Sequence, residues 1–325
     1  MDREPSPSRA PEKPVRSKRQ YIERHGWVIL NKPYGMGSTT AVTRVRHLLS
    51  VKKAGHAGTL DPLATGVLPI AIGEATKMIP FIQDHIKAYR FTVAWGIETT
   101  TLDKEGAVIK ESPIRPTATE IHAILPQFLG TIQQTPPLYS ALKIDGKRAY
   151  DIARAGETVD MPARNIYIQA LTLEAAYPNH ADFEVVCGKG TYVRSLARDI
   201  AGAVGTVAHV TALHRSQVGS FQDQKAISLE TLEELIHKGT ELAVEDPKLG
   251  LDDIPAVILE DVQLTRLCQG QRLKLAAHQY PSISLQEEIL DPCFVRCFNE
   301  AGHFKGIGRW DQEAQVLRPH RLLNL

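Results

Sequence analysis

Long hydrophobic runs are absent from this sequence of 325 residues. The most apolar stretch, residues 67–82, is interrupted by Glu74 and Lys77, so it cannot supply the roughly 18 apolar residues that a membrane helix needs. The first twenty residues contain four prolines and scattered charges but no apolar segment typical of a secretory signal. We therefore expect no membrane association and a cytoplasmic location.

Cysteine is also scarce, and common cofactor motifs are missing. Four cysteines with irregular spacing are too few for a disulfide framework, which favours a reducing compartment. Cys293 and Cys297 are separated by three residues without a matching second pair, so packed strand residues are a better interpretation than a zinc site. The glycine-rich fingerprints of dinucleotide and nucleoside triphosphate binding do not occur. We expect no bound metal.

The net charge is almost zero, because 38 lysines and arginines balance 37 aspartates and glutamates. Taken as an average, this balance argues against a highly basic coat protein for nucleic acid. The distribution is uneven, since residues 18–61 contain eight basic and two acidic side chains, and residues 228–261 contain ten acidic and two basic ones. We expect a positive cleft near residue 61, with the acidic segment turned away from it.

The order of the expected elements predicts an α+β fold. The length suggests about two domains, and strands and helices are interleaved without the regular rhythm of a doubly wound sheet. Ser38 or Thr39 is expected to cap the first helix, and Thr117 with Glu120 to form a capping box. The spacing of apolar residues predicts strands at 27–30, 89–95, 166–177 and 182–187, and helices at 38–49, 117–125 and 191–204.

Composition divides the chain into three parts. Residues 1–24 are rich in proline, serine and mixed charge, and we expect them to form a flexible arm. Residues 25–248 form the larger α+β domain, and prolines and a glycine close to residue 250 mark a junction. Residues 249–325 contain short strand-like runs separated by glycine turns, which predict a small β-rich second domain.

One segment concentrates small residues around a single carboxylate. Residues 54–69 contain three glycines together with Asp61. Glycine permits close backbone approach to a ligand, and Pro62 favours an extended conformation of Asp61. Such a loop can present one carboxylate for chemistry. An isolated Leu-Asp-Pro sequence is more often a plain turn, however, so the segment alone does not establish a function.

The same segment closely resembles a known active-site motif. Residues 55–66, GHAGTLDPLATG, are similar to the active-site motif of the TruB family of tRNA pseudouridine synthases. The resemblance covers about residues 26–325 and includes a C-terminal part similar to PUA RNA-binding domains. It implies a pseudouridine synthase mixed-sheet catalytic domain with an RNA-gripping insertion at about 136–165. Other matching motifs are KPYGMGS at 32–38, KAYR at 87–90, the turn at 96–106, QTPPLYSALK at 134–143, GKGTYVRSLARD at 188–199 and the closing strand at 213–221.

The resemblance implies an isomerase that uses no cofactor. The family breaks the bond between N1 and C1′ of a uridine in RNA, turns the uracil and rejoins it through C5. In the bacterial type the substrate is uridine 55 in the T-loop of tRNA. The implied partner is therefore the T-arm of tRNA, bound by a monomer without guide RNA or partner protein. Asp61 matches the catalytic carboxylate, and a covalent acylal, a Michael adduct and a glycal route all remain open.

Seven further residues match family positions in the site. Arg194 is expected to form a bidentate ion pair that orients Asp61, and Tyr89 to stack on the target base or act as base in a glycal route. Because a stacked uridine cannot reach a carboxylate, the nucleotide must flip out, and His56 matches the residue that fills the vacated space. Tyr192 and Leu213 are expected to line the pocket, Asp103 to contact the flipped nucleotide or its neighbours, and Lys143, with Lys147, Arg148 and Arg154, to bind phosphates.

Two other functions remain open. One is the related synthase that works with a guide RNA in a ribonucleoprotein, although a long lysine-rich extension is absent. The other is a non-catalytic RNA-binding or tRNA-folding protein, although Asp61, Tyr89 and Arg194 are all present. Without the resemblance, Asp103 would be expected to cap a turn and Arg194 to lie on a solvated helix face.

Overall fold

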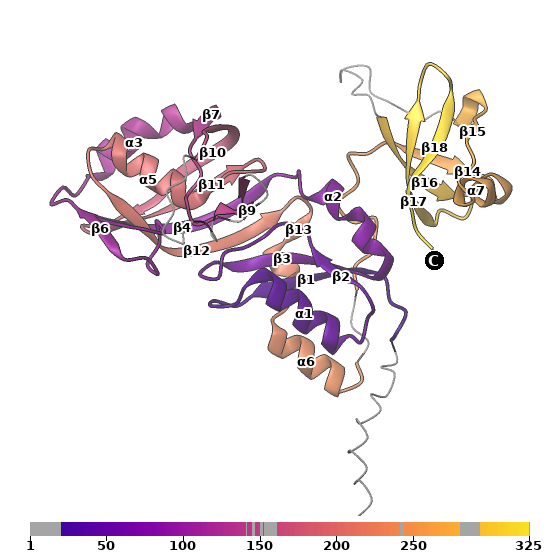
Figure 1. Cartoon of the computed structure of the whole chain (residues 1–325), viewed down its shortest axis with the longest axis horizontal. Coiled ribbons are helices and arrows are strands. Elements are labelled where there is room, and N and C mark those ends of the chain that lie inside the picture. Colours follow the sequence, from indigo (N-terminus) through magenta and orange to yellow (C-terminus); the bar gives the residue numbers. More distant parts are fainter. Residues whose placement is uncertain are drawn as a thin grey trace, which may run out of the picture.

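A large mixed sheet and a smaller sheet organise the structure (Figure 1), which is a computed structural model describing residues 21–140, 142–144, 147–149, 152, 161–240, 244–279 and 293–324. Among these residues, no helix combines the length and the apolar surface that crossing a membrane requires. The large sheet contains, in spatial order, β1 (Gly26–Lys32), β3 (Thr65–Ile72), β12 (Ala208–Val218), β4 (Lys87–Trp95), β11 (His180–Cys187), β10 (Arg164–Ala176) and β7 (Gly130–Gln134), with β2 (Ala54–His56) beside β3 and β13 (Phe221–Gln222) beside β12.

Strands β1, β2 and β3 form one part of this sheet, here called the N-terminal half-sheet. Alternation along β1 directs Val28 and Leu30 into the core beneath α1 (Ser38–Leu48) and α6 (Leu229–His237), whereas Trp27 enters a second core on the opposite face. Figure 1 shows α1 and α6 together on one side of these strands. The half-sheet is therefore buried on both faces.

Strands β12, β4, β11, β10 and β7 form the other part, here called the central half-sheet. Its inward residues include Phe91 of β4 and Phe183 of β11, whose rings stack at a centroid distance of 5.3 Å. These residues share a core with α3 (Ala118–Ile124) and with the apolar stripe of α5 (Val193–Ala203). The N-terminal end of α5 thereby becomes fixed over β4 and β12.

The two half-sheets meet at a narrow joint between β3 and β12. These strands pair in parallel through Thr65 with His214 and Gly66 with Arg215. Gly66 has a φ of +99°, and a Cβ atom there would lie 2.3 Å from the Arg215 carbonyl oxygen, so only glycine fits. The loop of residues 57–64, here called the Asp61 loop, leads directly into this joint from the N-terminal half-sheet.

Two short helices, η1 (Gly73–Met78) and α2 (Ile79–Ile82), carry the contact with the smaller sheet. Phe81 packs edge-on against Phe294 of that sheet at 5.3 Å between ring centroids. The smaller sheet contains, in spatial order, β14 (Ala256–Leu259), β16 (Cys293–Asn299), β17 (Phe304–Asp311), β18 (Val316–Leu322) and β15 (Leu273–Lys274), with α7 (Asp261–Cys268) and η4 (Ala277–Gln279) beside it. The remaining elements are β5 (Ile97–Thr99), β6 (Val108–Glu111), η2 (Leu125–Phe128), β8 (Lys143–Ile144), β9 (Lys147–Arg148) and η3 (Asp223–Lys225).

The predicted α+β class is confirmed, with a mixed sheet followed by a sheet-rich C-terminal part. The capping box at the start of α3 is confirmed as well, because the Thr117 hydroxyl accepts from the backbone of Glu120, whose carboxylate accepts in return from Thr117. The expected strands and helices all occur, with ends displaced by a few residues. Cys293 and Cys297 lie on β16, as expected for packed strand residues.

One local expectation is wrong. Neither Ser38 nor Thr39 caps α1, whose N-cap is Gly37. The Ser38 hydroxyl instead donates to the Leu60 carbonyl at 2.9 Å and accepts from the Leu60 N–H at 2.8 Å, so it anchors the Asp61 loop. Most of the arm expected over residues 1–24 lies outside the described residues, which begin at residue 21. In its last part the Ile22 N–H donates to the Ser50 carbonyl at 2.8 Å, and the boundary at residue 24 stays a prediction.

Candidate active site

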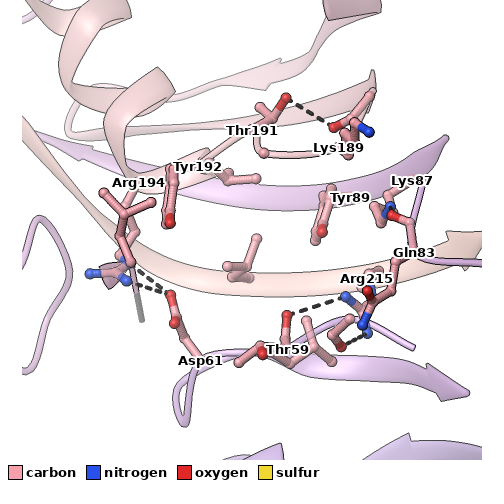
Figure 2. A pocket seen from close by; sticks show the side chains of 17 residues that line it. Thr59, Asp61, Gln83, Lys87, Tyr89, Lys189, Thr191, Tyr192, Arg194 and Arg215 are labelled. Carbon is pink, nitrogen blue, oxygen red and sulfur yellow. Dashed lines mark hydrogen bonds and ion pairs between the residues drawn. The ribbon is translucent and has the colours of Figure 1, made fainter. Parts of the chain in front are cut away.

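A pocket of about 400 Å³ opens between the two half-sheets. Figure 2 shows its lining, with Asp61 and Arg194 at one end and Lys87, Gln83 and Arg215 at the other. The Asp61 loop forms one wall, and β4, β12 and the start of α5 form the others. The pocket therefore draws its residues from segments that lie far apart in the sequence.

Asp61 and Arg194 form the ion pair that the sequence predicts. The Arg194 Nε donates to Asp61 Oδ2 at 2.8 Å, and Nη2 lies 2.7 Å from the same oxygen. The expected bidentate contact is thus made to one carboxylate oxygen rather than to two. Arg194 is buried, whereas the Asp61 side chain is 36% exposed. The carboxylate can accordingly contact a bound ligand while its arginine partner cannot.

The Arg194 guanidinium is held by three residues on two segments besides Asp61. Nη1 donates to the Thr101 carbonyl at 2.8 Å, and Nη2 donates to the Tyr139 carbonyl at 3.1 Å. Asp103 Oδ2 lies 3.7 Å from Nη1. These contacts fix the guanidinium before any ligand binds, which is the arrangement that catalysis by preorganised charge requires.

The start of α5 is fixed by an amide side chain that the sequence did not single out. Buried Gln134 accepts from the Tyr192 backbone N–H at 2.8 Å and donates to the Tyr192 carbonyl at 3.2 Å. Tyr192 is the N-cap residue of α5 and has no side-chain cap. The Gln134 amide therefore fixes the position of the Tyr192 backbone, and Arg194 reaches Asp61 from this end of α5.

Arg215 builds the other end of the pocket, and its role was not predicted although it lies in a recognised motif. Its Nε donates to the Val67 carbonyl at 2.8 Å, Nη2 to the Gly58 carbonyl at 3.1 Å and Nη1 to the Thr59 carbonyl at 3.4 Å. The arginine thus binds the backbone on both sides of Asp61. Only its place two residues after Leu213 on the same strand could have indicated that its side chain reaches the pocket.

Two buried lysines lie close to the pocket. Lys87 lines it near Arg215, and Lys32 holds the Asp61 loop by donating to the Pro62 carbonyl at 3.3 Å. Lys32 donates to the Met36 carbonyl at 2.6 Å, and burial lowers its pKa to about 8 even though Asp61 opposes the shift. Lys87 donates to the carbonyls of Gln83 and His85, both at 2.6 Å. Burial lowers the pKa of Lys87 to about 8, and the positive charge of Arg215 contributes to this shift. Both ammonium groups therefore organise backbone turns around the pocket.

Tyr89, Tyr192 and Leu213 all line the pocket, as predicted. Figure 2 shows the two tyrosine rings side by side along the wall opposite the Asp61 loop. Burial raises the pKa of Tyr89, although the neighbouring Arg215 opposes this shift by its charge and by a hydrogen bond. The phenol is thus neutral at ordinary pH, and it is better suited to stacking and hydrogen bonding than to proton abstraction.

Of the other three predicted residues, His56 and Asp103 are not among the described residues that line this pocket. His56 lies on β2, and its Nδ1 is buried without a hydrogen-bond partner among the described residues, while burial lowers its pKa. Asp103 is buried, and its Oδ1 accepts from the Thr101 hydroxyl at 2.5 Å and from the Glu105 N–H at 3.0 Å. Lys143 lies on β8, but its side chain is outside the described residues, as are those of Lys147, Arg148 and Arg154.

The charge pattern of the pocket agrees with the sequence expectation. Among the residues that the structure describes, four cationic side chains and one carboxylate, that of Asp61, line it. No described residue of the acidic segment 228–261 contributes to the lining. Helix α6 of that segment packs on α1 instead, where Glu233 pairs with Arg44 at 2.6 Å. The cationic lining comprises Lys87, Lys189, Arg194 and Arg215.

Comparison with known proteins assigns this arrangement to a family. Residues 46–193 match the model of the TruB family pseudouridylate synthase N-terminal domain. Residues 194–259 match the tRNA pseudouridylate synthase B C-terminal domain, and residues 255–323 match the C-terminal model of pseudouridine synthase II TruB. The chain belongs to the TruB family. It is therefore an enzyme, an isomerase of the pseudouridine synthase type.

Relatives in the TruB family are similar over most of the chain. The tRNA pseudouridine synthase B of Caulobacter sp. strain K31 is 50% identical over 260 residues, which cover 79% of this chain and 84% of the relative. That of Rhodopseudomonas palustris is 50% identical over 279 residues, covering 84% of this chain and 75% of the relative. The matched residues thus cover most of this chain.

Solved structures show the same fold at lower sequence identity. The structure of an H/ACA RNP bound to a substrate RNA containing 2′-deoxyuridine matches with a TM-score of 0.70 and 21% identity, covering 92% of this chain and 85% of that chain. A Cbf5-Nop10-Gar1 complex matches with a TM-score of 0.68 and 22% identity, covering 89% and 79%. The fold shared with these chains thus covers about nine tenths of this chain.

Proposed function

We propose that this TruB-family enzyme converts uridine 55 in the T-loop of tRNA to pseudouridine, with Asp61 as the catalytic carboxylate. The observation that carries the proposal is the ion pair of Asp61 with the buried, preorganised Arg194 at one end of a cationic pocket. The names of the relatives, tRNA pseudouridine synthase B, support tRNA as the substrate.

The geometry of the pocket supports the following course of the reaction. A uridine inside the folded T-arm is stacked and cannot reach Asp61, so the nucleotide flips into the pocket, at a cost of a few kcal/mol. There the N1–C1′ bond breaks, the uracil turns, a C5–C1′ bond forms, and the C5 proton is lost while N1 gains one. Because Arg194 binds Oδ2 of Asp61 with two nitrogens, Oδ1 is the oxygen that we assign to the reaction.

The remaining residues bind and position the nucleotide. Tyr89 stacks on the uracil as a neutral phenol, which supports the routes that use Asp61 as nucleophile over a route with Tyr89 as base. His56, with its buried Nδ1 lacking a partner among the described residues, fills the space that the base leaves and hydrogen-bonds to RNA. Asp103 acts through Arg194, since it lies beneath that guanidinium.

The wider assignment follows from the same family membership. We place the arm at residues 1–24, the catalytic domain at 25–248, with its insertion at about 136–165, and a PUA-like RNA-binding domain at 249–325. Lys143 in the insertion binds RNA phosphate. The enzyme acts as a cytoplasmic monomer on the T-arm, without a guide RNA or partner protein.

A direct test uses the purified protein alone. Unmodified tRNA transcript is incubated with the protein, and pseudouridine is mapped by carbodiimide-dependent primer extension. A single stop that reports position 55 is the expected result. A stop elsewhere would contradict the substrate assignment, and activity that appears only with added RNA and protein partners would favour the guide-dependent synthase. Tight T-arm binding without product would favour the RNA-folding protein.

A further inference from the structure

The joint between the half-sheets carries a hydrogen-bonded chain of three side chains outside the pocket. Thr65 Oγ1 lies 2.8 Å from His214 Nδ1, and His214 Nε2 lies 2.8 Å from Asp223 Oδ2. Thr65 starts β3, His214 lies on β12 and Asp223 starts η3. We call these three side chains the joint relay. It links both half-sheets to the turn that follows β13.

The chemistry of the three groups gives the relay a direction. A carboxylate can only accept a hydrogen bond, so the His214 Nε2 carries the hydrogen that binds Asp223. In the neutral imidazole, Nδ1 then has a free lone pair and accepts from the Thr65 hydroxyl. Asp223 thereby fixes the tautomer and the ring orientation of His214, and His214 in turn fixes Thr65.

The relay lies opposite the Arg215 anchor. Consecutive residues of a strand point to opposite faces, so Arg215 reaches the pocket side of β12 while His214 reaches the other side. Arg215 binds the carbonyls of Gly58 and Thr59, which precede Asp61. Within the relay, His214 binds Thr65, which follows Asp61. The Asp61 loop is thus anchored at both ends to a single strand of the central half-sheet.

A displacement of Thr65 would also move Asp61. The Ala64 N–H donates to the Asp61 carbonyl at 3.0 Å, which closes a tight turn between Asp61 and Thr65. The joint itself contains two residue pairs, and a Cβ at Gly66 would lie 2.9 Å from His214 Cε1, so the strands are in close contact there. Asp61 comes from one half-sheet and Arg194 from the other, so their contact depends on this joint.

We propose that the joint relay is a positioning device for the reaction, with His214 as its central positioning residue. It sets the placement of the N-terminal half-sheet on the central one and thereby aligns Asp61 with Arg194. The inference rests on the proposed function, because alignment matters only if Asp61 reacts. None of the three side chains contacts the nucleotide in this assignment, so the relay changes the rate of conversion rather than the affinity for RNA.

The test compares Thr65→Val, which keeps the shape and loses the hydroxyl, with Thr65→Ser, which keeps the hydroxyl. Single-turnover conversion of a T-arm RNA should slow roughly tenfold in Thr65→Val, the rate equivalent of about one hydrogen bond. The RNA dissociation constant should stay within about twofold. Thr65→Ser should convert at close to the wild-type rate, and all variants should be measured well below their unfolding temperatures.

A second comparison asks whether the three side chains act as one unit. Asp223→Ala should slow conversion to a similar degree, and the double variant Thr65→Val, Asp223→Ala should be no slower than either single one. An unchanged rate in Thr65→Val, an equal loss in Thr65→Ser or multiplicative losses in the double variant would each overturn the inference. Absence of product with the wild-type chain would instead overturn the proposed function, and the inference with it.

Discussion

An arginine closes each end of the pocket, and the two ends differ in what the arginine binds. Arg194 pairs with the carboxylate of Asp61, which comes from the opposite half-sheet. Arg215 binds three backbone carbonyls, and among the described residues no carboxylate lies within ion-pair distance of it. Figure 2 shows both contacts against the same loop. One arginine therefore orients the reacting group, and the other shapes the loop that carries it.

The two ends of the pocket also differ in the positive charge that they offer to RNA. At the Arg194 end the guanidinium is neutralised by Asp61 and supported by Asp103. At the other end Arg215 and Lys87 bind carbonyls, and Arg215 also binds the Tyr89 phenol, so among the described residues no carboxylate pairs with either charge. An anionic substrate gains most at such a place. We therefore expect variants at the Arg194 end to affect the chemical step most strongly.

The largest effect is expected from Asp61→Asn, which keeps the shape of the side chain and removes the reacting carboxylate. Conversion of uridine should fall by roughly 10⁴-fold or more, as for loss of an essential nucleophile. Binding of T-arm RNA, measured by filter retention, should remain close to the wild-type value. Full conversion by this variant would contradict the catalytic assignment of Asp61.

Arg194→Met should follow, because it removes the preorganised charge but keeps a long side chain in the helix. The single-turnover rate should fall by roughly 10²–10³-fold, the usual cost of losing one electrostatic contact at a reacting group. The affinity for RNA should change much less. Equal losses of rate and affinity would indicate that Arg194 binds phosphate instead of orienting Asp61.

Whether the sequence predicts the contacts of each arginine depends on the type of contact. The motifs around Asp61 and Arg194 predicted their pairing, because a carboxylate and a guanidinium in matching family positions have one obvious relation. Nothing in the pattern distinguishes an arginine such as Arg215, which binds backbone carbonyls instead of a carboxylate, from a surface arginine. Ser38 was misassigned for a similar reason, since a serine before a helix can cap it or, as here, bind a distant loop.

The general architecture was more predictable than the joint. Apolar alternation and a capping box indicated the strands and α3, because these depend on neighbouring residues. The pairing of β3 with β12 joins residues that lie about 150 positions apart, since Thr65 meets His214 at a separation of 149. No local pattern encodes that contact. The burial of Lys32 likewise follows from tertiary packing alone.

A pH experiment examines the Asp61 loop through Lys32, which donates to the Pro62 carbonyl at 3.3 Å. Its pKa is about 8 in the folded protein against 10.5 for an ordinary lysine. Between these values the unfolded chain binds more protons, so the contribution of Lys32 to the free energy of unfolding rises with pH. The full change is on the order of 3 kcal/mol. Denaturant unfolding of wild type and Lys32→Met from pH 7 to 11 should show their difference growing in favour of the wild type.

The smallest effect is expected at the other end, from Arg215→Lys. Lysine keeps the charge but presents a compact ammonium in place of the planar fork that reaches three carbonyls. The turnover rate should fall about tenfold, as for the loss of one or two hydrogen bonds. RNA affinity should be nearly unchanged, because the positive charge remains. A loss as large as that of Arg194→Met would show that both arginines act on the reacting group.

The most direct test of a catalytic pair built across the two half-sheets is a double-mutant cycle. Single-turnover rates with T-arm RNA are measured for wild type, Asp61→Asn, Arg194→Met and the double variant. If Arg194 acts only by orienting Asp61, the double variant will be no slower than Asp61→Asn alone. Losses that multiply in the double variant would contradict the pair and show that the two residues act independently.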